Sequence, residues 1–351
     1  VIYFDPADVE RPIGLNMLEA ATPEEMDFVS QEMVSMFYQL VTDPSMIGPM
    51  FEHSMRNAMF TLMANKENPG TIADIPRIFT DDDFVKYNLQ FVTDPMVRAY
   101  WEKEMAKQSE QQKGEMLGYL ISKVGRFVEN GLMRNIIGQQ KSGFDFADVM
   151  NNQKILLVNL SKGKIGDINS QLLGLIIVSK LTMAALRRAG MAEEERRDFY
   201  LYIDEFQNYI TDSISTILSE ARKYRLSLII AHQYIGQLVK NGDPKIKEAV
   251  LGNAGTICSF KIGIEDAEII AKEFAPTVNA YDLINTENFH MYMKLLVDNR
   301  STRAFTVKTI YEPAGDPMLA EKLKQLSRLK FGRERKQIEA EVLERTKLGQ
   351  Q

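Results

Sequence analysis

Cysteine and histidine are scarce in this sequence of 351 residues. Its one cysteine, Cys258, excludes an intrachain disulfide and a cysteine-based zinc site, and the apolar run around it predicts a buried thiol. The three histidines lie far apart in the chain, which argues against a histidine metal cluster. This residue usage is typical of a reduced, cytoplasmic protein.

The sequence also lacks a long hydrophobic run and an excess of positive charge. No stretch of 18 apolar residues occurs, so no transmembrane helix is predicted. A formal net charge of −6 argues against a protein that coats nucleic acid with a basic surface. It remains compatible with a ring whose narrow channel is locally basic, because the field depends on where the charges lie. The 45% hydrophobic share provides enough core for one large domain or two ordinary ones.

Four regions follow one another along the chain. Residues 1–16 form a predicted first strand, Val1–Phe4, and a loop. Residues 17–150 read as helical throughout, with aspartates and prolines between the helices. Residues 151–315 alternate strands and helices, and residues 316–351 form a charged helix. No initiator methionine is present, and a domain seldom begins inside its own sheet, so we expect a fragment of a longer protein.

The third region predicts the fold class. Ile155–Leu160 is a continuous apolar run, which is typical of a strand buried on both faces. Strands alternating with helices predict an α/β fold, with a mostly parallel sheet covered by helices on both sides and an all-α insertion. The last two strands, 290–297 and 303–310, flank a turn and predict a C-terminal β-hairpin.

The most informative segment is the strand 199–203, which ends in Asp204 and Glu205. Open parallel sheets bind their ligands at the carboxyl ends of the strands. In P-loop ATPases, the first acid of such a pair holds Mg²⁺ and the second polarises the water that attacks the γ-phosphate. An acidic pair at a strand end is common, so the pair alone is weak evidence.

Two further polar residues strengthen this interpretation. Arg222 precedes the next strand and is suited to act on a neighbouring subunit's site as an arginine finger. Gln233 follows that strand and is suited to bind the γ-phosphate or the attacking water. The alternatives are an ion pair with Glu220 or solvent exposure for Arg222, and a polar loop residue for Gln233.

The segments 218–224 and 228–233, read as LSEARKY and LIIAHQ, resemble the HerA–FtsK superfamily, in particular the TraG/TraD-like coupling ATPases of conjugation and type IV secretion. Segments 134–138, 159–163 and 251–257 are also similar to this family. The resemblance spans residues 1–312. It implies a RecA-like P-loop NTPase that binds ATP and Mg²⁺ between the subunits of a homo-hexamer, with DNA in the channel. It assigns Asp204 and Glu205 to the Walker B acids, Arg222 to the arginine finger and Gln233 to the sensor glutamine.

One family motif is missing. No G-x-x-x-x-G-K-[S/T] occurs in the sequence, so nothing in it provides the phosphate-binding loop. We expect the loop upstream of Val1, together with any N-terminal membrane anchor, and the 351 residues alone to be inactive. The resemblance further implies relaxase or secretion-channel proteins as partners, and a location in the cytoplasm at the inner face of the membrane.

DNA contacts are predicted at Lys162 and Lys164, in the loop 161–166, which can reach phosphates without reading sequence. A solvated loop is the alternative. Three functions therefore follow from the sequence: a DNA-translocating coupling ATPase, a related secretion ATPase acting on protein, and a non-enzymatic assembly subunit.

Overall fold

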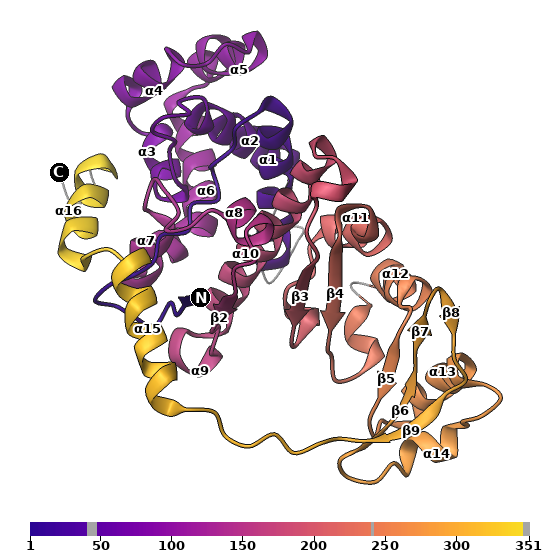
Figure 1. The fold of residues 1–351 in the computed structure, drawn as a ribbon. Helices are drawn as coiled ribbons and strands as arrows, with labels where there is room; N and C mark the ends of the chain where they lie inside the picture. Colours follow the sequence, from indigo (N-terminus) through magenta and orange to yellow (C-terminus); the bar gives the residue numbers. More distant parts are fainter. Residues whose placement is uncertain (41–47, 240–241, 347–351) are drawn as a thin grey trace. The chain divides into compact units, whose positions relative to one another are not determined.

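The computed structural model describes residues 1–40, 48–239 and 242–346. They divide into two compact units (Figure 1). Unit 1 comprises residues 1–199, 211–213 and 317–351, and unit 2 comprises residues 200–210 and 214–316. Only residues up to 346 of the last segment are described.

Unit 1 is mainly helical, with two short strands. Four of its helices begin after an aspartate or asparagine that caps the helix, namely Asp81, Asp94, Asn130 and Asp145. Asp94 Oδ1, for example, accepts from the backbone N–H of Met96 at 2.8 Å, and Pro95 stands at the first helical position. The elements are β1 Ile2–Phe4, α1 Pro23–Leu40, α2 Pro49–Met63, α3 Ile75–Ile78, α4 Asp82–Leu89, α5 Pro95–Ala99, the π-helix Tyr100–Met105, α6 Glu110–Glu129, α7 Gly131–Ile137, α8 Phe146–Asn151, β2 Leu156–Val158, α9 Lys162–Ile165 and α10 Asp167–Arg187.

Strands β1 and β2 pair in parallel, with Ile2 opposite Leu156 and Phe4 opposite Val158. Helix α15, Pro317–Phe331, lies beside β1. The Ser327 hydroxyl on α15 accepts from the backbone N–H of Tyr3 at 2.8 Å and donates to the Tyr3 carbonyl at 3.2 Å. One buried side chain therefore satisfies both backbone groups on the free edge of β1.

The sequence predicted that the strand around Leu157 is buried on both faces. For β2 this prediction is wrong. Ile155 is 57% exposed and Leu157 is 50% exposed. An apolar run in sequence does not distinguish a strand covered on two faces from one covered on a single face, because both lack polar alternation.

Helix α10 and the turn after it, Asp167–Gly190, are the one segment of the described chain that is long and apolar enough to cross a membrane. In this fold 83% of its most apolar window is buried, with Leu173 and Leu175 completely inaccessible. Its apolar character is thus accounted for by packing in the core of unit 1.

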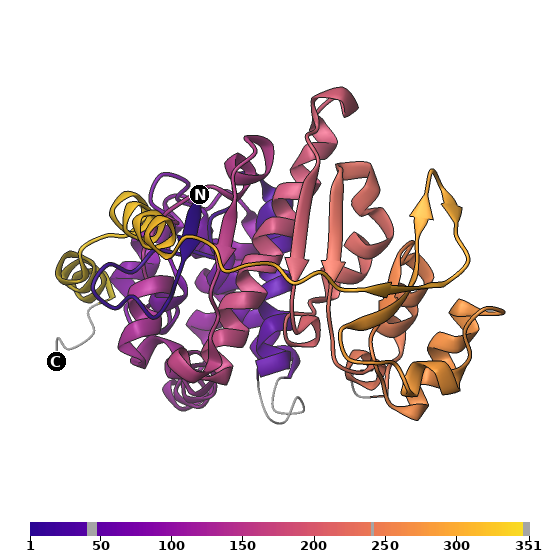
Figure 2. The same ribbon diagram turned by 60° about the horizontal axis from the view of Figure 1, so that its bottom comes forward.

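Unit 2 contains the other strands, in three hydrogen-bonded groups: β3–β4, the antiparallel sheet β5–β6–β9 and the small hairpin β7–β8. The predicted C-terminal β-hairpin is confirmed, since β6 pairs with β9. Helices α13 and α14 pack on this sheet around Phe274 and Leu283 (Figure 2). The elements are β3 Phe199–Ile203, α11 Asp212–Glu220, β4 Leu226–Ile230, α12 Lys245–Asn253, β5 Ile257–Ser259, α13 Ile264–Phe274, α14 Ala280–Ile284, β6 His290–Lys294, β7 Leu296–Val297, β8 Arg300–Ser301 and β9 Phe305–Lys308.

Two helices, α15 and α16 (Arg335–Thr346), lie in the C-terminal segment, where the sequence predicted a single helix. The last five residues of this segment lie outside the described chain. The chain bends at Gly332, where a Cβ atom would lie 2.4 Å from the Arg11 carbonyl oxygen. Beyond the bend, Arg345 pairs with Asp74, whose side chain is fully buried, at 3.0 Å. Helix α16 is thereby fixed to the helical insertion.

The prediction of a buried thiol at Cys258 is also wrong. Cys258 lies in β5 and is exposed. Partial burial raises the pKa of its thiol, so the group is less readily ionised than an ordinary cysteine. Its apolar neighbour Ile257 packs against the buried cluster from the other face of the strand, because side chains alternate.

Candidate active site

The two predicted acids lie in a turn directly after β3. The aromatic and aliphatic residues of β3 favour a strand, and Phe206, which is completely buried, anchors the turn. Ala231, just after β4, donates to the Ile203 carbonyl at 3.0 Å and accepts from the Phe206 N–H at 2.9 Å. The carboxyl ends of β3 and β4 are therefore adjacent (Figure 1), as the argument from a parallel sheet required.

Glu205 adopts a left-handed backbone conformation, with φ 50° and ψ 45°. This conformation costs a residue other than glycine about 1–3 kcal/mol and is concentrated at functional sites. It is supported by the Asn208 N–H and side-chain amide, which donate to the Glu205 carbonyl at 3.0 and 3.1 Å. The turn thus holds Glu205 away from the direction in which the strand would have continued.

The structure brings Glu205 and Gln233 together. Gln233 Nε2 donates to Glu205 Oε1 at 2.8 Å. Gln207, which the sequence argument did not single out, donates from Nε2 to Glu205 Oε2 at 2.5 Å. Its position two residues after the acid, on the same turn, is the only signal in the sequence that could have identified it.

Asp204 is exposed beside this cluster. Its Oδ1 accepts from the Glu205 N–H at 2.9 Å, while Oδ2 makes no hydrogen bond within the described chain. Mg²⁺ is bound in proteins through one or two carboxylates together with water and phosphate oxygens. An exposed carboxylate with one oxygen available fits that role, so Asp204 is the residue here that would hold the ion.

Arg222 does not join the acids within one chain. It is exposed in the 3₁₀ turn Ala221–Tyr224, which precedes β4, whereas Gln233 follows β4. The five residues of β4 separate the two by about 16 Å at about 3.3 Å per residue. Its neighbour Glu220 pairs with Lys223 at 3.5 Å. A role for Arg222 at such a site therefore requires a second subunit, as the sequence argument supposed.

Lys162 and Lys164 lie in unit 1, on the single turn of α9 and not in the predicted loop. Both are exposed, and Lys162 Nζ is 3.7 Å from the Asp167 carboxylate. Gly166, with φ +83°, separates α9 from α10, and this conformation favours glycine. The lysines are accessible, but one of them already has an acidic neighbour.

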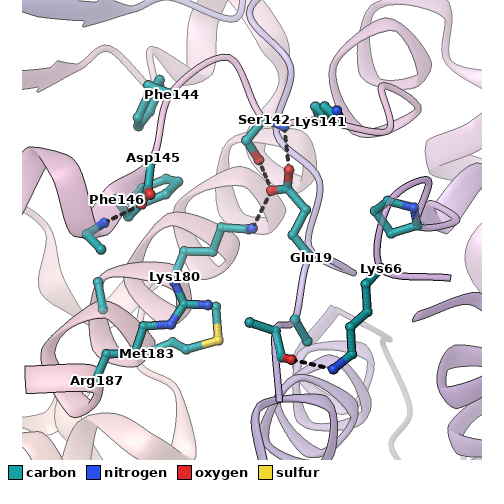
Figure 3. A pocket seen from close by; sticks show the side chains of 15 residues that line it. Glu19, Lys66, Lys141, Ser142, Phe144, Asp145, Phe146, Lys180, Met183 and Arg187 are labelled. Atoms are coloured by element: carbon teal, nitrogen blue, oxygen red, sulfur yellow. Dashed lines mark hydrogen bonds and ion pairs between the residues drawn. The ribbon is translucent and has the colours of Figure 1, made fainter. Parts of the chain in front are cut away.

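A cavity of about 470 Å³ lies elsewhere in unit 1, where residues 19–21 and 141–147 connect the helical insertion to the rest of the unit (Figure 3). Glu19 accepts there from the Ser142 N–H and hydroxyl at 2.8 and 2.5 Å and from Lys180 Nζ at 2.9 Å. None of the six predicted site residues lines the cavity. We assign its ionic cluster to holding the connectors.

Residues 198–307 match the protein family described as the TraM recognition site of TraD and TraG. The predicted TraG/TraD-like resemblance is therefore confirmed over the segment that contains the acids, Arg222 and Gln233. A search of characterised proteins found no significant sequence match.

Solved structures with similar folds include conjugative coupling proteins. TrwB lacking its first 70 residues, in an unbound form, has a TM-score of 0.54 at 12% identity, covering 89% of this chain and 74% of that one. TrwB in complex with ADP and Mg²⁺ has a TM-score of 0.57 at 12% identity, covering 90% and 75%. VirB4 of Thermoanaerobacter pseudethanolicus has a TM-score of 0.58 at 14% identity, covering 89% and 77%. The predicted RecA-like α/β fold is confirmed.

Proposed function

We propose that this protein is an ATP-driven DNA translocase, the coupling ATPase of a conjugative or type IV secretion-like system. One observation carries the proposal: Glu205 and Gln233 are hydrogen-bonded at adjacent strand ends inside the segment that matches the TraD and TraG family. A carboxylate and an amide at this position are suited to hold the water that attacks a γ-phosphate.

The proposed reaction assigns a separate task to each residue. Bound ATP supplies the phosphoryl group and Mg²⁺ neutralises its charge, and Asp204 would hold the ion. Glu205 orients the attacking water and accepts its proton, while Gln233 responds to the γ-phosphate. Arg222 acts on the site of the adjacent subunit in a homo-hexameric ring. DNA passes through the channel, with Lys162 and Lys164 on its phosphates.

The proposal also covers what lies outside these 351 residues. We place the phosphate-binding loop upstream of Val1, so that the 351 residues alone are inactive. Any membrane anchor would also lie upstream of Val1. The protein would then work at the cytoplasmic face of the cell membrane. The matched family's description, recognition of TraM, supports a protein partner such as a relaxase or channel component.

The test is ATP hydrolysis by the full-length protein with and without DNA. We expect DNA to stimulate hydrolysis. We expect E205Q to lower kcat by at least about 100-fold while nucleotide still binds, because glutamine keeps the size of the side chain but removes the carboxylate that accepts the proton. Hydrolysis by E205Q at the wild-type rate would remove Glu205 from this role and the proposal with it.

The second candidate is a related secretion ATPase that acts on protein. The fold similarity does not decide between the two substrates, since the TM-scores for VirB4 and for TrwB with ADP are nearly equal, 0.58 and 0.57. Hydrolysis alone does not separate the two, so the deciding result is the effect of duplex DNA. Hydrolysis that duplex DNA leaves unchanged would favour the protein substrate. A non-enzymatic assembly subunit would lack the phosphate-binding loop in the full-length sequence.

A further inference from the structure

Both carboxylate oxygens of Glu205 have an amide donor. Gln207 donates to Oε2 at 2.5 Å and Gln233 to Oε1 at 2.8 Å. Anchoring a carboxylate at both oxygens fixes its rotation as well as its position, which a single hydrogen bond cannot do.

The two donors differ in how firmly the fold holds them. Gln207 is half-buried in the 3₁₀ turn Phe206–Asn208, which the buried Phe206 anchors. Gln233 is exposed after β4, and its backbone N–H bonds to the side chain of Gln237 at 3.2 Å. A half-buried side chain on a packed turn has fewer rotamers available than an exposed one. Gln207 is therefore the fixed donor and Gln233 the one free to exchange partners.

The orientation of the Gln207 amide that lets it donate to Glu205 leaves its own oxygen without a hydrogen bond. Its Oε1 is buried and has no hydrogen-bond partner within the described chain. The reverse orientation would set this oxygen against the carboxylate, acceptor against acceptor, so Nε2 must face Glu205. A buried acceptor without a donor is unfavourable, and so is the left-handed backbone of Glu205. Two unfavourable features beside one carboxylate indicate that the turn is arranged for that carboxylate.

We propose that Gln207 is a positioning residue that holds Glu205 in place while Gln233 leaves it for the γ-phosphate. This inference rests on the proposed ATPase function. When Gln233 turns to the nucleotide, the hydrogen bond from Gln207 still holds Oε2 of Glu205 at the moment this carboxylate must orient water.

The test is Q207M in the full-length protein, since methionine keeps the length of the side chain and removes the donor. We expect kcat to fall about 10- to 100-fold, the effect of a misplaced catalytic group, with KM nearly unchanged. A loss of folding would instead lower the thermal stability and change KM together with kcat.

Q325M is the matched control. Gln325 Nε2 also donates to a glutamate, Glu321 Oε1 at 2.9 Å, but on the exposed surface of α15. The control should retain the wild-type kcat. A wild-type kcat in Q207M, beside an inactive E205Q, would overturn the role of Gln207 and leave the proposed function standing. Equal hydrolysis by wild type and E205Q would overturn both.

Discussion

Replacing Glu19 by glutamine should destabilise unit 1 strongly, because it leaves a buried lysine without its ion-pair partner. The side chain of Lys180 is only 5% exposed and its partner Glu19 is 29% exposed. Removing one member of a buried ion pair costs about 3–5 kcal/mol, and the partial exposure of Glu19 favours the lower end. For a unit of roughly 240 residues the unfolding entropy is about 0.5 kcal/mol/K, which gives a fall in Tm of about 6–10 °C.

The fluorescence of Trp101 is a suitable measurement. Trp101 is the one tryptophan of these 351 residues, it lies in unit 1, and its Nε1 donates to the Thr61 hydroxyl at 2.8 Å in a buried setting. Its emission during heating therefore follows the unfolding of the unit that contains the pair. The double variant E19Q/K180M should recover most of the loss, since replacing both charges avoids the uncompensated one.

The pH dependence adds a second check. Burial, the largest cause, lowers the pKa of Lys180, and the Glu19 carboxylate opposes that shift. Without Glu19 the pKa should fall further. A lysine whose pKa is lower in the folded than in the unfolded state binds fewer protons when folded, so stability rises with pH between the two values. The E19Q deficit should thus shrink in alkaline buffer. A Tm within about 2 °C of wild type at neutral pH would refute the reasoning.

Three further predictions concern other parts of the chain. Mixing R222A with E205Q, each inactive alone, should restore part of the ATPase activity, because an intact site can form from one subunit's acid and the other's arginine; no recovery would mean that both act within one subunit. D74N should lower the free energy of unfolding by about 3–5 kcal/mol, since the guanidinium paired with it loses its carboxylate; an unchanged denaturation midpoint would contradict this. The double variant K162A/K164A should reduce the slope of log K against log salt for duplex DNA by about 2, and an identical slope would exclude these lysines from phosphate contacts.

The acids, Gln233 and the alternation of strands and helices could be predicted because each depends on local sequence. An apolar strand followed by polar residues marks the carboxyl end of that strand, which is where open α/β sheets bind their ligands. The exposure of Leu157 and Cys258 could not be predicted, since burial depends on which elements cover a strand.

Gln207 was missed for a different reason. Its contact with Glu205 depends on the left-handed backbone of the acid, which no pattern of residue types indicates. The bend at Gly332 likewise depends on the close approach of the Arg11 backbone, from the opposite end of the chain. Both features arise from tertiary contacts, which sequence periodicity does not report.

The hydroxyl of Ser327 has a consequence for how the β1–β2 sheet can grow. An uncovered edge strand invites pairing with any extended segment, including one from another molecule. Here the two backbone groups that Tyr3 would offer are already occupied by a helix. Additional strands can therefore pair only with β2, because the outer edge of β1 is blocked. The variant S327A would free that edge, and we expect it to aggregate in a concentration-dependent manner.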